Sequence, residues 1–447
     1  MRIKYIFFLV LSFGLFVFNG CKKDDATEPA LNTGTANFSK FVTIGNSITA
    51  GYQSGSLFKS AQVYSYGNLI AAKVGTSFEQ PYIADPGTAG RMELTGLTST
   101  GDPIIFYNTV SGQPENTAYA APYNNLGVPG ATLYDVLGAT KSADCFAAIN
   151  GGGANANPMF DLILRNSALN IGSQYKQAKA LKATFVTLWI GNNDVLGYAT
   201  SGGTSPAMPL PAANFTALYK ATLDSLSTLG AGVVVANIPN VTDIPFFTTI
   251  GPALLKKGYP KYVYAQGSDK QVRLMSLANN YLTLKASALL TTSTGAPTGI
   301  GLSPANPFPS AVVLDSAEVT TAVNAVNNFN ASIATLAAAK GFAVVDINTF
   351  FSNFKKADAT GGTVVDGLVF KTDYISGGIF SLDGVHPSSR AQGLIANEFI
   401  RVINAKYGSN ISSVKISTIT PNFQKALPMT SFGIPVLPKG TFDNLLF

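Results

Sequence analysis

The chain has 447 residues, of which 46% are hydrophobic and only 12% are charged, so it is long and apolar enough to bury a large core. Intrinsic disorder requires low hydrophobicity and high net charge, and this composition excludes it for the chain as a whole. The net charge of +6 is spread along the sequence without a basic stripe, which argues against nucleic-acid binding.

The first twenty residues have the pattern of a secretory signal peptide. Arg2 and Lys4 precede an apolar run over residues 6–18, which is shorter than the roughly 20 residues that a membrane-spanning helix takes. Cys21 follows directly after a glycine, an arrangement that resembles a bacterial lipobox. The resemblance implies that residues 1–20 are removed and that Cys21 is acylated as the mature N-terminus. A plain signal peptide with an incidental cysteine is the alternative.

Residues 21–37 are rich in Thr, Pro, Asn and Gly, which predicts a flexible linker between the lipid and the folded domain. The acidic pair Asp24 and Asp25 close to the cysteine resembles the surface-export signal of lipoproteins in Bacteroidetes-type bacteria. We therefore expect an outer-membrane lipoprotein of the cell envelope that is exposed at the surface, with a merely solvated linker as the alternative. Once Cys21 is acylated, Cys145 is alone, which excludes an intramolecular disulfide and a cysteine-built metal site.

From residue 38 onward, apolar runs alternate with helical patterns, as they do in a parallel α/β sheet. The expected strands are almost continuous runs of apolar residues, which is typical of strands covered on both faces: 41–44, 124–128, 184–190, 232–238 and 342–347. The expected helices are 63–74, 159–169, 215–229, 316–339 and 389–407. The last of these carries an apolar stripe and ends at a glycine.

Two stretches do not fit a minimal sheet. Residues 76–123 are rich in Gly, Pro, Thr and Tyr, and residues 246–310 hold six prolines around a possible helix at 270–290. Loops this long are usually functional, so we expect both to be insertions at the mouth of a site within a domain that spans 38–408. The tail over 409–447 is apolar and punctuated by prolines, and its pattern assigns no structure or role.

Ser47 lies just beyond the end of the first expected strand, in the string Gly45-Asn46-Ser47-Ile48. Ligands bind at the carboxyl ends of the strands in an open parallel sheet, and a serine on a sharp turn there exposes its hydroxyl. Taken alone, the string could equally be an ordinary turn. The chain contains no Gly-x-Ser-x-Gly string, which argues against the nucleophile elbow of an α/β-hydrolase.

His386 is the only histidine in the chain, and Asp383 precedes it by three residues in a loop bounded by glycine and proline. At this spacing the carboxylate can accept a hydrogen bond from the imidazole, which fixes its tautomer and stabilises the imidazolium. The other ring nitrogen is then free to take a proton from a serine, and histidine is the side chain suited to that role near neutral pH. A lone histidine with a purely structural role is the alternative.

Two further strand ends offer hydrogen-bond donors. The string over 124–132 contains glycines, whose backbone N–H can approach a substrate oxygen closely because no Cβ intervenes. The string Gly191-Asn192-Asn193-Asp194 offers side-chain amides, and losing one oxyanion donor typically costs roughly 100- to 1,000-fold in rate. Each string taken alone could be an ordinary strand-to-helix turn.

In order and type, the four strings together resemble those of the SGNH (GDSL-type) hydrolases. The resemblance implies a triad of Ser47 as nucleophile, His386 as base and Asp383 as its charged partner. It implies an oxyanion hole formed by the backbone N–H of Ser47, by Gly130 and by Asn193.

Neighbouring residues decide which glycine and which asparagine correspond to the family strings. Gly130 is preferred to Gly127 because Ala131 follows it as in the family pattern, and Asn193 is the asparagine that directly precedes the aspartate. Asn46 stands where the family name places an aspartate. That side chain is not a triad member, so the departure leaves the chemistry intact.

The resemblance also implies a fold and an activity. The fold is the SGNH hydrolase fold, a three-layer α/β/α domain with a parallel flavodoxin-like sheet of about five strands, here enlarged by the two insertions. The activity is ester hydrolysis through an acyl-serine intermediate, without a metal or cofactor. Acyl esters, lysophospholipids and acetylated glycans all stay open as substrates. The alternatives are a carbohydrate O-acetyl esterase on the same triad and a non-catalytic surface binding lipoprotein, for which a broken triad would be expected.

Overall fold

Five parallel strands form the central sheet of the computed structural model, in the order β11-β6-β5-β1-β4. Their bounds are β1 Phe41–Gly45, β4 Asn125–Gly127, β5 Phe185–Trp189, β6 Gly232–Ala236 and β11 Ala343–Val345. In chain order this is the flavodoxin-like arrangement 2-1-3-4-5. All five lie where the sequence predicts strands, and β1, β4 and β5 are buried along their whole length, as expected of strands covered on both faces.

The structure describes residues 30–291, 296–421, 433–438 and 440–442. The predicted signal peptide, Cys21 and the acidic pair after it lie outside the described residues. Within the described ranges, no helix combines the length and the apolar character needed to cross a membrane.

The register of the sheet brings three strand ends to the same level. Gly45 at the end of β1 is aligned with Gly127 of β4 on one side and with Trp189 of β5 on the other. The segments that follow these strands therefore leave the sheet together at its carboxyl edge. These segments carry three of the four strings singled out in the sequence.

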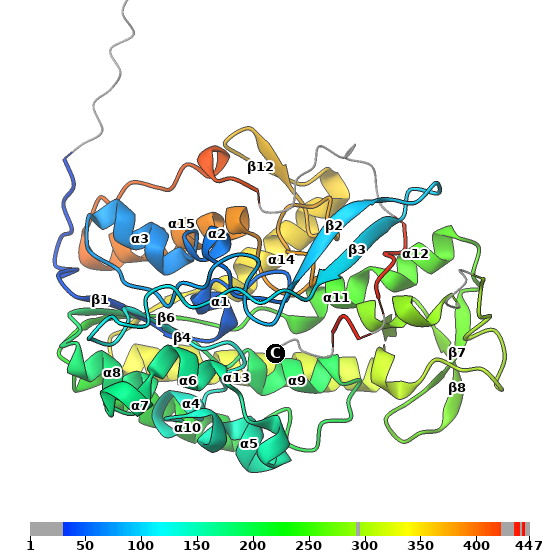
Figure 1. Cartoon of the computed structure of the whole chain (residues 1–447), viewed down its shortest axis with the longest axis horizontal. Helices are drawn as coiled ribbons and strands as arrows, with labels where there is room; N and C mark the ends of the chain where they lie inside the picture. Colours follow the sequence, from blue (N-terminus) through cyan, green and yellow to red (C-terminus); the bar gives the residue numbers. More distant parts are fainter. Residues whose placement is uncertain (1–29, 292–295, 422–432, 439, 443–447) are drawn as a thin grey trace, which may run out of the picture.

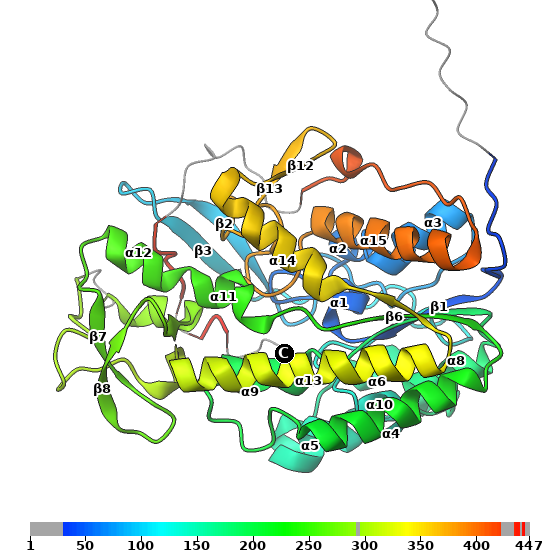
Figure 2. The same cartoon turned by 180° about the vertical axis from the view of Figure 1, so that it is seen from behind.

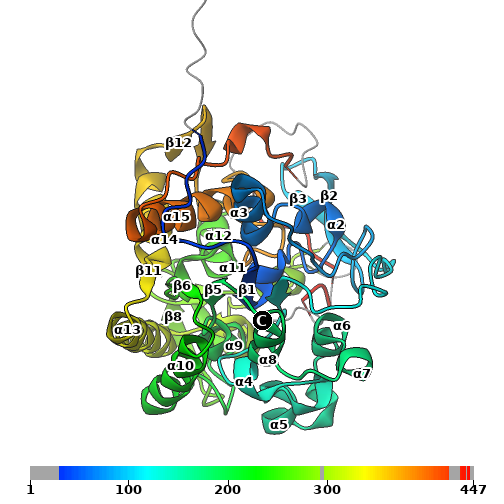
Figure 3. The same cartoon turned by 90° about the vertical axis from the view of Figure 1, so that its left-hand side faces the viewer.

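Helices cover both faces of the sheet, giving the predicted three layers (Figures 1 and 3). One layer contains α3 (Tyr66–Val74), α14 (Ile347–Ala357) and α15 (Ser389–Tyr407). The other contains α6 (Met159–Leu164), α8 (Gln174–Ala180), α9 (Asn193–Thr200), α10 (Ala212–Ser227) and α13 (Ser316–Ala339), as the reverse view also shows (Figure 2). Shorter helices are α1 (Ser47–Ala50), α2 (Lys59–Gln62), α4 (Asp135–Gly138), α5 (Phe146–Gly151) and α7 (Asn166–Leu169).

Helix bounds agree with the sequence where caps define them. The predicted bounds of α13 and α15 are confirmed to the residue, because Asp315 and Glu318 form a capping box at the start of α13 and Gly408 ends α15 in the left-handed conformation. The helix predicted over 159–169 is instead two helices, α6 and α7, which are separated at Arg165 with φ +48°. The helix predicted over 63–74 begins later, at α3, after the separate turn of α2.

The first insertion contains an antiparallel hairpin, β2 (Arg91–Leu97) and β3 (Pro103–Asn108). Part of the unassigned C-terminal tail pairs with it. The N–H of Ile105 donates to the carbonyl of Val436 at 3.0 Å, and the N–H of Val436 donates to the carbonyl of Pro103 at 2.8 Å. The tail thus adds a short parallel segment to the edge of this hairpin.

The second insertion corrects one prediction. It contains most of α11 (Pro245–Thr248), α12 (Ile250–Lys256), and the hairpin β7 (Tyr262–Gln266) and β8 (Val272–Ser276). It also contains β9 (Tyr281–Leu282), which pairs with β10 (Val313–Leu314) just beyond the insertion. The helix predicted over 270–290 is therefore wrong: that stretch holds β8, β9 and a 3₁₀ helix over Leu284–Leu289. Backbone pairing with β7, which lies upstream of the stretch, overrides its local helical pattern. A further hairpin, β12 (Thr363–Val365) and β13 (Leu368–Phe370), precedes α15.

The end of the predicted linker is attached to the domain. The N–H of Thr35 donates to the carbonyl of Tyr407 at 2.9 Å, and the N–H of Asn410 donates to the carbonyl of Asn32 at 2.9 Å. Beyond α15 the tail returns along that helix, with Ile411, Val414, Ile416 and Ile419 buried. Residues from Asn32 onward are thus part of the folded domain, so the linker predicted to extend to residue 37 is shorter.

Arg165 attaches the first insertion to the helix layer. Its guanidinium donates to the carbonyls of Thr117, Tyr119 and Ala121 at 2.5–3.1 Å and lies 3.9 Å from the ring centroid of Tyr123. The side chain is largely buried, so water cannot readily replace these bonds.

We expect Arg165→Met to lower the free energy of unfolding by about 2–4 kcal/mol, because three carbonyls lose a charged donor while the apolar stem is kept. The matched control is Arg401→Met, which removes an exposed ion pair to Glu398 and should cost less than about 1 kcal/mol. Urea denaturation of both variants checks this. Equal losses in the two variants would show that Arg165 is not an anchor.

Candidate active site

Ser47 is the first residue of α1, directly after β1 and the connecting residue Asn46. The side chain of Asn46 caps the short helix by accepting a hydrogen bond from the N–H of Ile48 at 3.2 Å. The turn needs glycine before it, because a Cβ on Gly45 would lie 2.2 Å from Thr49 Oγ1 and 2.4 Å from the carbonyl oxygen of Trp189. Close packing of β1 against β5 and α1 thus fixes the position of Ser47.

His386 and Asp383 lie against Ser47 although they come from the other end of the chain. His386 Nε2 lies 2.9 Å from Ser47 Oγ, and His386 Nδ1 lies 3.0 Å from Asp383 Oδ2. All three side chains are buried, with 3% of Ser47, 1% of His386 and none of Asp383 exposed. A neutral imidazole that carries its proton on Nδ1 would donate to Asp383 and accept from the Ser47 hydroxyl.

The carboxylate of Asp383 is held by four hydrogen bonds. Its Oδ1 accepts the N–H of Val385 at 2.9 Å and that of His386 at 2.8 Å, and its Oδ2 accepts from the imidazole and from the N–H of Gly55 at 3.1 Å. Burial alone would raise the pKa of Asp383, but the charge of His386 and these hydrogen bonds outweigh it and lower the pKa below its ordinary value. Asp383 is therefore an ionised carboxylate at neutral pH.

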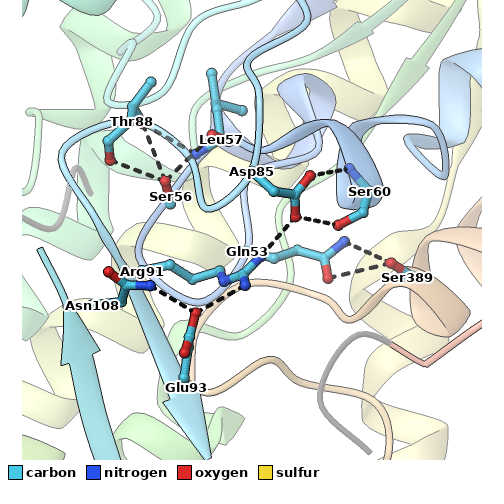
Figure 4. Close-up of polar contacts among 10 residues, drawn as sticks. All are labelled: Gln53, Ser56, Leu57, Ser60, Asp85, Thr88, Arg91, Glu93, Asn108 and Ser389. Atoms are coloured by element: carbon cyan, nitrogen blue, oxygen red, sulfur yellow. Dashed lines mark hydrogen bonds and ion pairs between the residues drawn. The ribbon is translucent and has the colours of Figure 1, made fainter. Parts of the chain in front are cut away.

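The loop after α1 is fixed to the Asp383–His386 loop by contacts that sequence reasoning missed. Besides the Gly55 bond to Asp383, the N–H of Ser54 donates to Ser381 Oγ at 2.9 Å. Gln53 Nε2 donates to Ser389 Oγ at 3.2 Å (Figure 4). A turn signal is visible in Ser54-Gly55, both of which have positive φ, but its partner lies 328 residues away.

The same loop is also attached to the first insertion (Figure 4). Ser56 Oγ donates to the carbonyl of Thr88 at 3.0 Å, and Ser60 Oγ donates to Asp85 Oδ1 at 2.7 Å. Arg91 of β2 pairs with Asp85 and with Glu93, both at 2.9 Å. The insertion thus supports the loop that donates to Asp383.

Of the two predicted oxyanion donors besides Ser47, Asn193 lines the same cavity as Ser47 and His386. It begins α9, and its Nδ2 donates one hydrogen bond to the carbonyl of Ala131 at 2.8 Å, which leaves its second N–H for another acceptor. Gly130, with φ +79°, directly precedes Ala131 and is not among the residues that line the cavity. The Asn193 bond therefore joins the two predicted donor segments to each other.

Two buried carboxylates hold the segment that follows Gly130. Asp135 Oδ2 accepts the N–H of Thr132 at 2.7 Å, and Asp194 Oδ2 accepts the N–H of Leu133 at 2.9 Å. Burial raises the pKa of Asp135 to about 6, and burial, with a contribution from the Asp135 charge, raises that of Asp194 to about 7. The other oxygen of Asp194 is buried with no hydrogen-bond partner within the described part of the chain.

The cavity beside Ser47 and His386 has a volume of about 40 Å³. Its lining is mostly apolar, but the asparagines Asn46 and Asn192 also line it, and each has a buried side-chain polar atom without a partner among the described residues. Either could therefore meet a polar group of a substrate. Across the described ranges, no three His, Cys, Asp or Glu side chains gather as metal ligands would.

The family model of the GDSL-like lipases/acylhydrolases matches residues 41–399, most of the chain and all four strings. The chain belongs to this family. It is accordingly a carboxylic ester hydrolase, and the predicted family and fold are confirmed. Comparison with curated protein sequences gave no significant match.

Solved structures resemble the GDSL-like chain only distantly. The alpha/beta hydrolase LAE5 from the metagenome of Lake Arreo, Spain, is 12% identical with a TM-score of 0.35, over 83% of this chain and 97% of its own. The acetylxylan esterase Axe2 from Geobacillus stearothermophilus is 11% identical with a TM-score of 0.34, over 83% and 96%. The extracellular lipase from Streptomyces rimosus is 16% identical with a TM-score of 0.29, over 82% and 98%. TM-scores this low support no conclusion about the substrate.

The raised pKa of Asp194 predicts a pH-dependent stability. In the unfolded chain the carboxyl loses its proton near 3.8, whereas in the folded chain it keeps the proton up to about 7. The folded state binds more protons across this range, so the free energy of unfolding should fall as pH rises from about 4 to 7, by up to about 4 kcal/mol.

Asp194→Asn should abolish the contribution of Asp194 to this fall of the unfolding free energy with pH, since an amide has no proton to lose. Asp135→Asn should abolish a smaller part, because the pKa of Asp135 is raised only to about 6. Urea denaturation at pH 4, 5, 6, 7 and 8 measures both slopes. A wild-type slope retained in full by Asp194→Asn would contradict the assignment.

Proposed function

We propose that the chain hydrolyses esters through an acyl-serine intermediate, with Ser47 as nucleophile and His386 as general base and acid. His386 Nε2 takes the proton of Ser47 Oγ as this oxygen attacks the ester carbonyl. The same nitrogen then gives the proton to the departing alcohol. It next activates a water that attacks the acyl carbon, which releases the acid and restores the Ser47 hydroxyl.

The observation that carries this proposal is the continuous relay from Ser47 Oγ through His386 to Asp383, at 2.9 and 3.0 Å. The chain contains no other histidine that could act as the base. The lowered pKa of Asp383 keeps its carboxylate charged, so it can fix the imidazole tautomer and stabilise the imidazolium that forms during attack. An intact relay also argues against the alternative of a binding protein that has lost its triad.

Hydrogen-bond donors must stabilise the negative charge that develops on the carbonyl oxygen during attack. We assign this role to the backbone N–H of Ser47, the backbone N–H of Gly130 and the second N–H of the Asn193 side chain. The contact between Asn193 and Ala131 supports this assignment, because it places the two donor segments next to each other at the sheet edge. Such donors act strongly because a buried site has no water to compete with them.

The proposal also includes a lipid anchor at Cys21, in the cell envelope at the outer membrane. Support comes from the signal-peptide pattern before Cys21 and from the attachment of Asn32 to the domain. Only the eleven residues 21–31 then separate the lipid from the domain, a reach of at most about 40 Å.

The described chain starts beside the amino end of β1, at the end of the molecule opposite the hairpins β2–β3 and β7–β8 (Figure 1). Ser47 follows the carboxyl end of β1. This arrangement favours a substrate that reaches the site from the aqueous side, such as an acetylated glycan, over a lipid of the anchoring membrane. A lysophospholipid or other acyl ester is the second candidate.

Ser47→Ala should lower kcat/KM on p-nitrophenyl acetate by at least about 10⁴-fold while leaving the melting temperature nearly unchanged, because a single nucleophile is lost. His386→Ala should lose as much, apart from residual catalysis by the oxyanion donors. The matched control is Ser225→Ala in α10, whose Oγ donates to the carbonyl of Ala221 in the same helix and which should keep most of the activity. Near-normal turnover by purified Ser47→Ala would falsify the nucleophile assignment.

The pH profile tests the base separately. We expect kcat/KM of the wild type to fall at acid pH, because a ring that carries a proton on both nitrogens cannot accept the Ser47 proton. Asp383 should not limit this profile, since its lowered pKa keeps it charged there. Measuring kcat/KM on a neutral ester from pH 4 to 9 tests this fall at acid pH. A flat profile across pH 5 to 8 would make the only histidine a structural residue.

Cys21→Ser should move the protein from the membrane fraction to the soluble fraction, because the proposed anchor is lost. The full-length wild type, fractionated in parallel after a high-salt wash, is the control. If the serine variant still sediments with membranes, the anchor lies elsewhere in the chain.

A further inference from the structure

We infer that this site accepts short acyl groups, from acetyl to about butyryl, and excludes long fatty-acyl chains; the inference rests on the proposed role of Ser47. The cavity beside Ser47 and His386 holds about 40 Å³. A cavity needs about 10–15 Å³ to hold even one water, so this cavity is small. An octanoyl chain has seven carbons beyond its carbonyl and would have to extend beyond the cavity.

The walls of the cavity have the character of an acyl pocket. Leu196 of α9, Val241, Ile244 and Val385 line it, and all four side chains are buried. The polar lining residues are those of the proposed chemistry and the two asparagines beside them. A short hydrocarbon chain on the ester carbonyl would therefore lie on the apolar walls while its carbonyl carbon faced Ser47 Oγ.

A second cavity of about 40 Å³ adjoins the first. Four residues line both cavities and so form the partition between them: Ile48, Pro239, Ile244 and Val385. A longer chain could enter the second cavity only if this partition opened. The depth of the acyl pocket is thus set by the partition.

Hydrogen bonds of the Asp383–His386 loop and of α11 hold the partition in place. Val385 belongs to the loop of Asp383, which accepts its N–H at 2.9 Å, so Val385 cannot withdraw without disturbing that carboxylate. Ile244 precedes α11, and its carbonyl accepts the N–H of Phe247 at 3.0 Å. The N–H of Phe246 in turn donates to the carbonyl of Gly384 at 2.9 Å, which joins α11 to the same loop.

The wild type gives the first test, on p-nitrophenyl esters of two, four, six and eight carbons. We expect kcat/KM on octanoate to be at least about 100-fold below that on acetate, with the fall setting in beyond butyrate. Ser47→Ala, measured on the same esters, shows which activity passes through the proposed nucleophile.

Two variants should change the accepted acyl-chain length in opposite directions. Ile244→Ala removes part of the partition and should raise the octanoate-to-acetate ratio at least about 10-fold. Leu196→Phe narrows the first cavity and should lower the butyrate-to-acetate ratio by a similar factor. The control is Ile163→Ala in α6, which truncates a buried isoleucine that lines neither cavity and should leave both ratios unchanged. These ratios do not depend on the fraction of folded enzyme, so partial unfolding of a variant cannot imitate the effect.

The outcomes separate the two proposals. Ser47-dependent activity that is as high on octanoate as on acetate overturns the short-acyl inference and leaves the proposed function standing. Ratios that stay fixed in Ile244→Ala and Leu196→Phe likewise overturn the assigned partition. Activity that survives Ser47→Ala, or no hydrolysis of any ester by the wild type, overturns the proposed function and the inference with it.

Discussion

A buried, ionised carboxylate organises the site of this protein. Asp383 has no exposed surface, and a charge in such a place is costly unless hydrogen bonds and an opposite charge compensate it. The compensation comes from two backbone N–H groups of its own loop, from Gly55 and from the His386 ring. Those hydrogen bonds also fix the positions of the groups that donate them. Asp383, which the proposed chemistry requires to be charged, therefore also determines the conformation of its loop.

The Gly55 bond links this loop to the rest of the fold. Gly55 lies just beyond α1, and the first insertion supports its loop through Ser56 and Thr88. The second insertion reaches the same loop from the other side through the bond between Phe246 and Gly384. The two long insertions thus both support the loop of Asp383 and His386, although neither supplies a residue of the proposed triad.

This arrangement explains how a site built from a widely shared sheet can have its own selectivity. The sheet edge fixes Ser47, and the strings after β4 and β5 fix the proposed oxyanion donors. Ile244, which lies just before the second insertion, belongs to the partition between the two small cavities. Val385 of the Asp383–His386 loop forms the other side of that partition. The proposed acyl pocket and the proposed triad would thus be coupled through packing, and substitutions there are expected to change selectivity and rate together.

Much of the fold is determined by the sequence itself. The five strands lie in mostly apolar runs of the sequence, and α13 and α15 carry their own caps, so both kinds of element are local properties of the chain. The four chemical strings lie at ends of these local elements, which is why Ser47, Asp383, His386 and Asn193 could be named before any coordinates. The structure brings Ser47, His386 and Asn193 to one cavity and places Asp383 behind His386, 3.0 Å from its Nδ1.

Other features were decided only by the tertiary structure. The stretch over 270–290 pairs with β7 instead of forming a helix, and Val436 of the unassigned tail pairs beside Ile104. Gly55 and Asp383 meet across 328 residues of sequence, and the cavity beside Ser47 is lined by side chains of four separate segments. A periodic sequence pattern indicates which residues are buried, but it does not identify the residues that they contact. Where a distant partner supplies the hydrogen bonds or the cavity wall, only the folded chain reveals it.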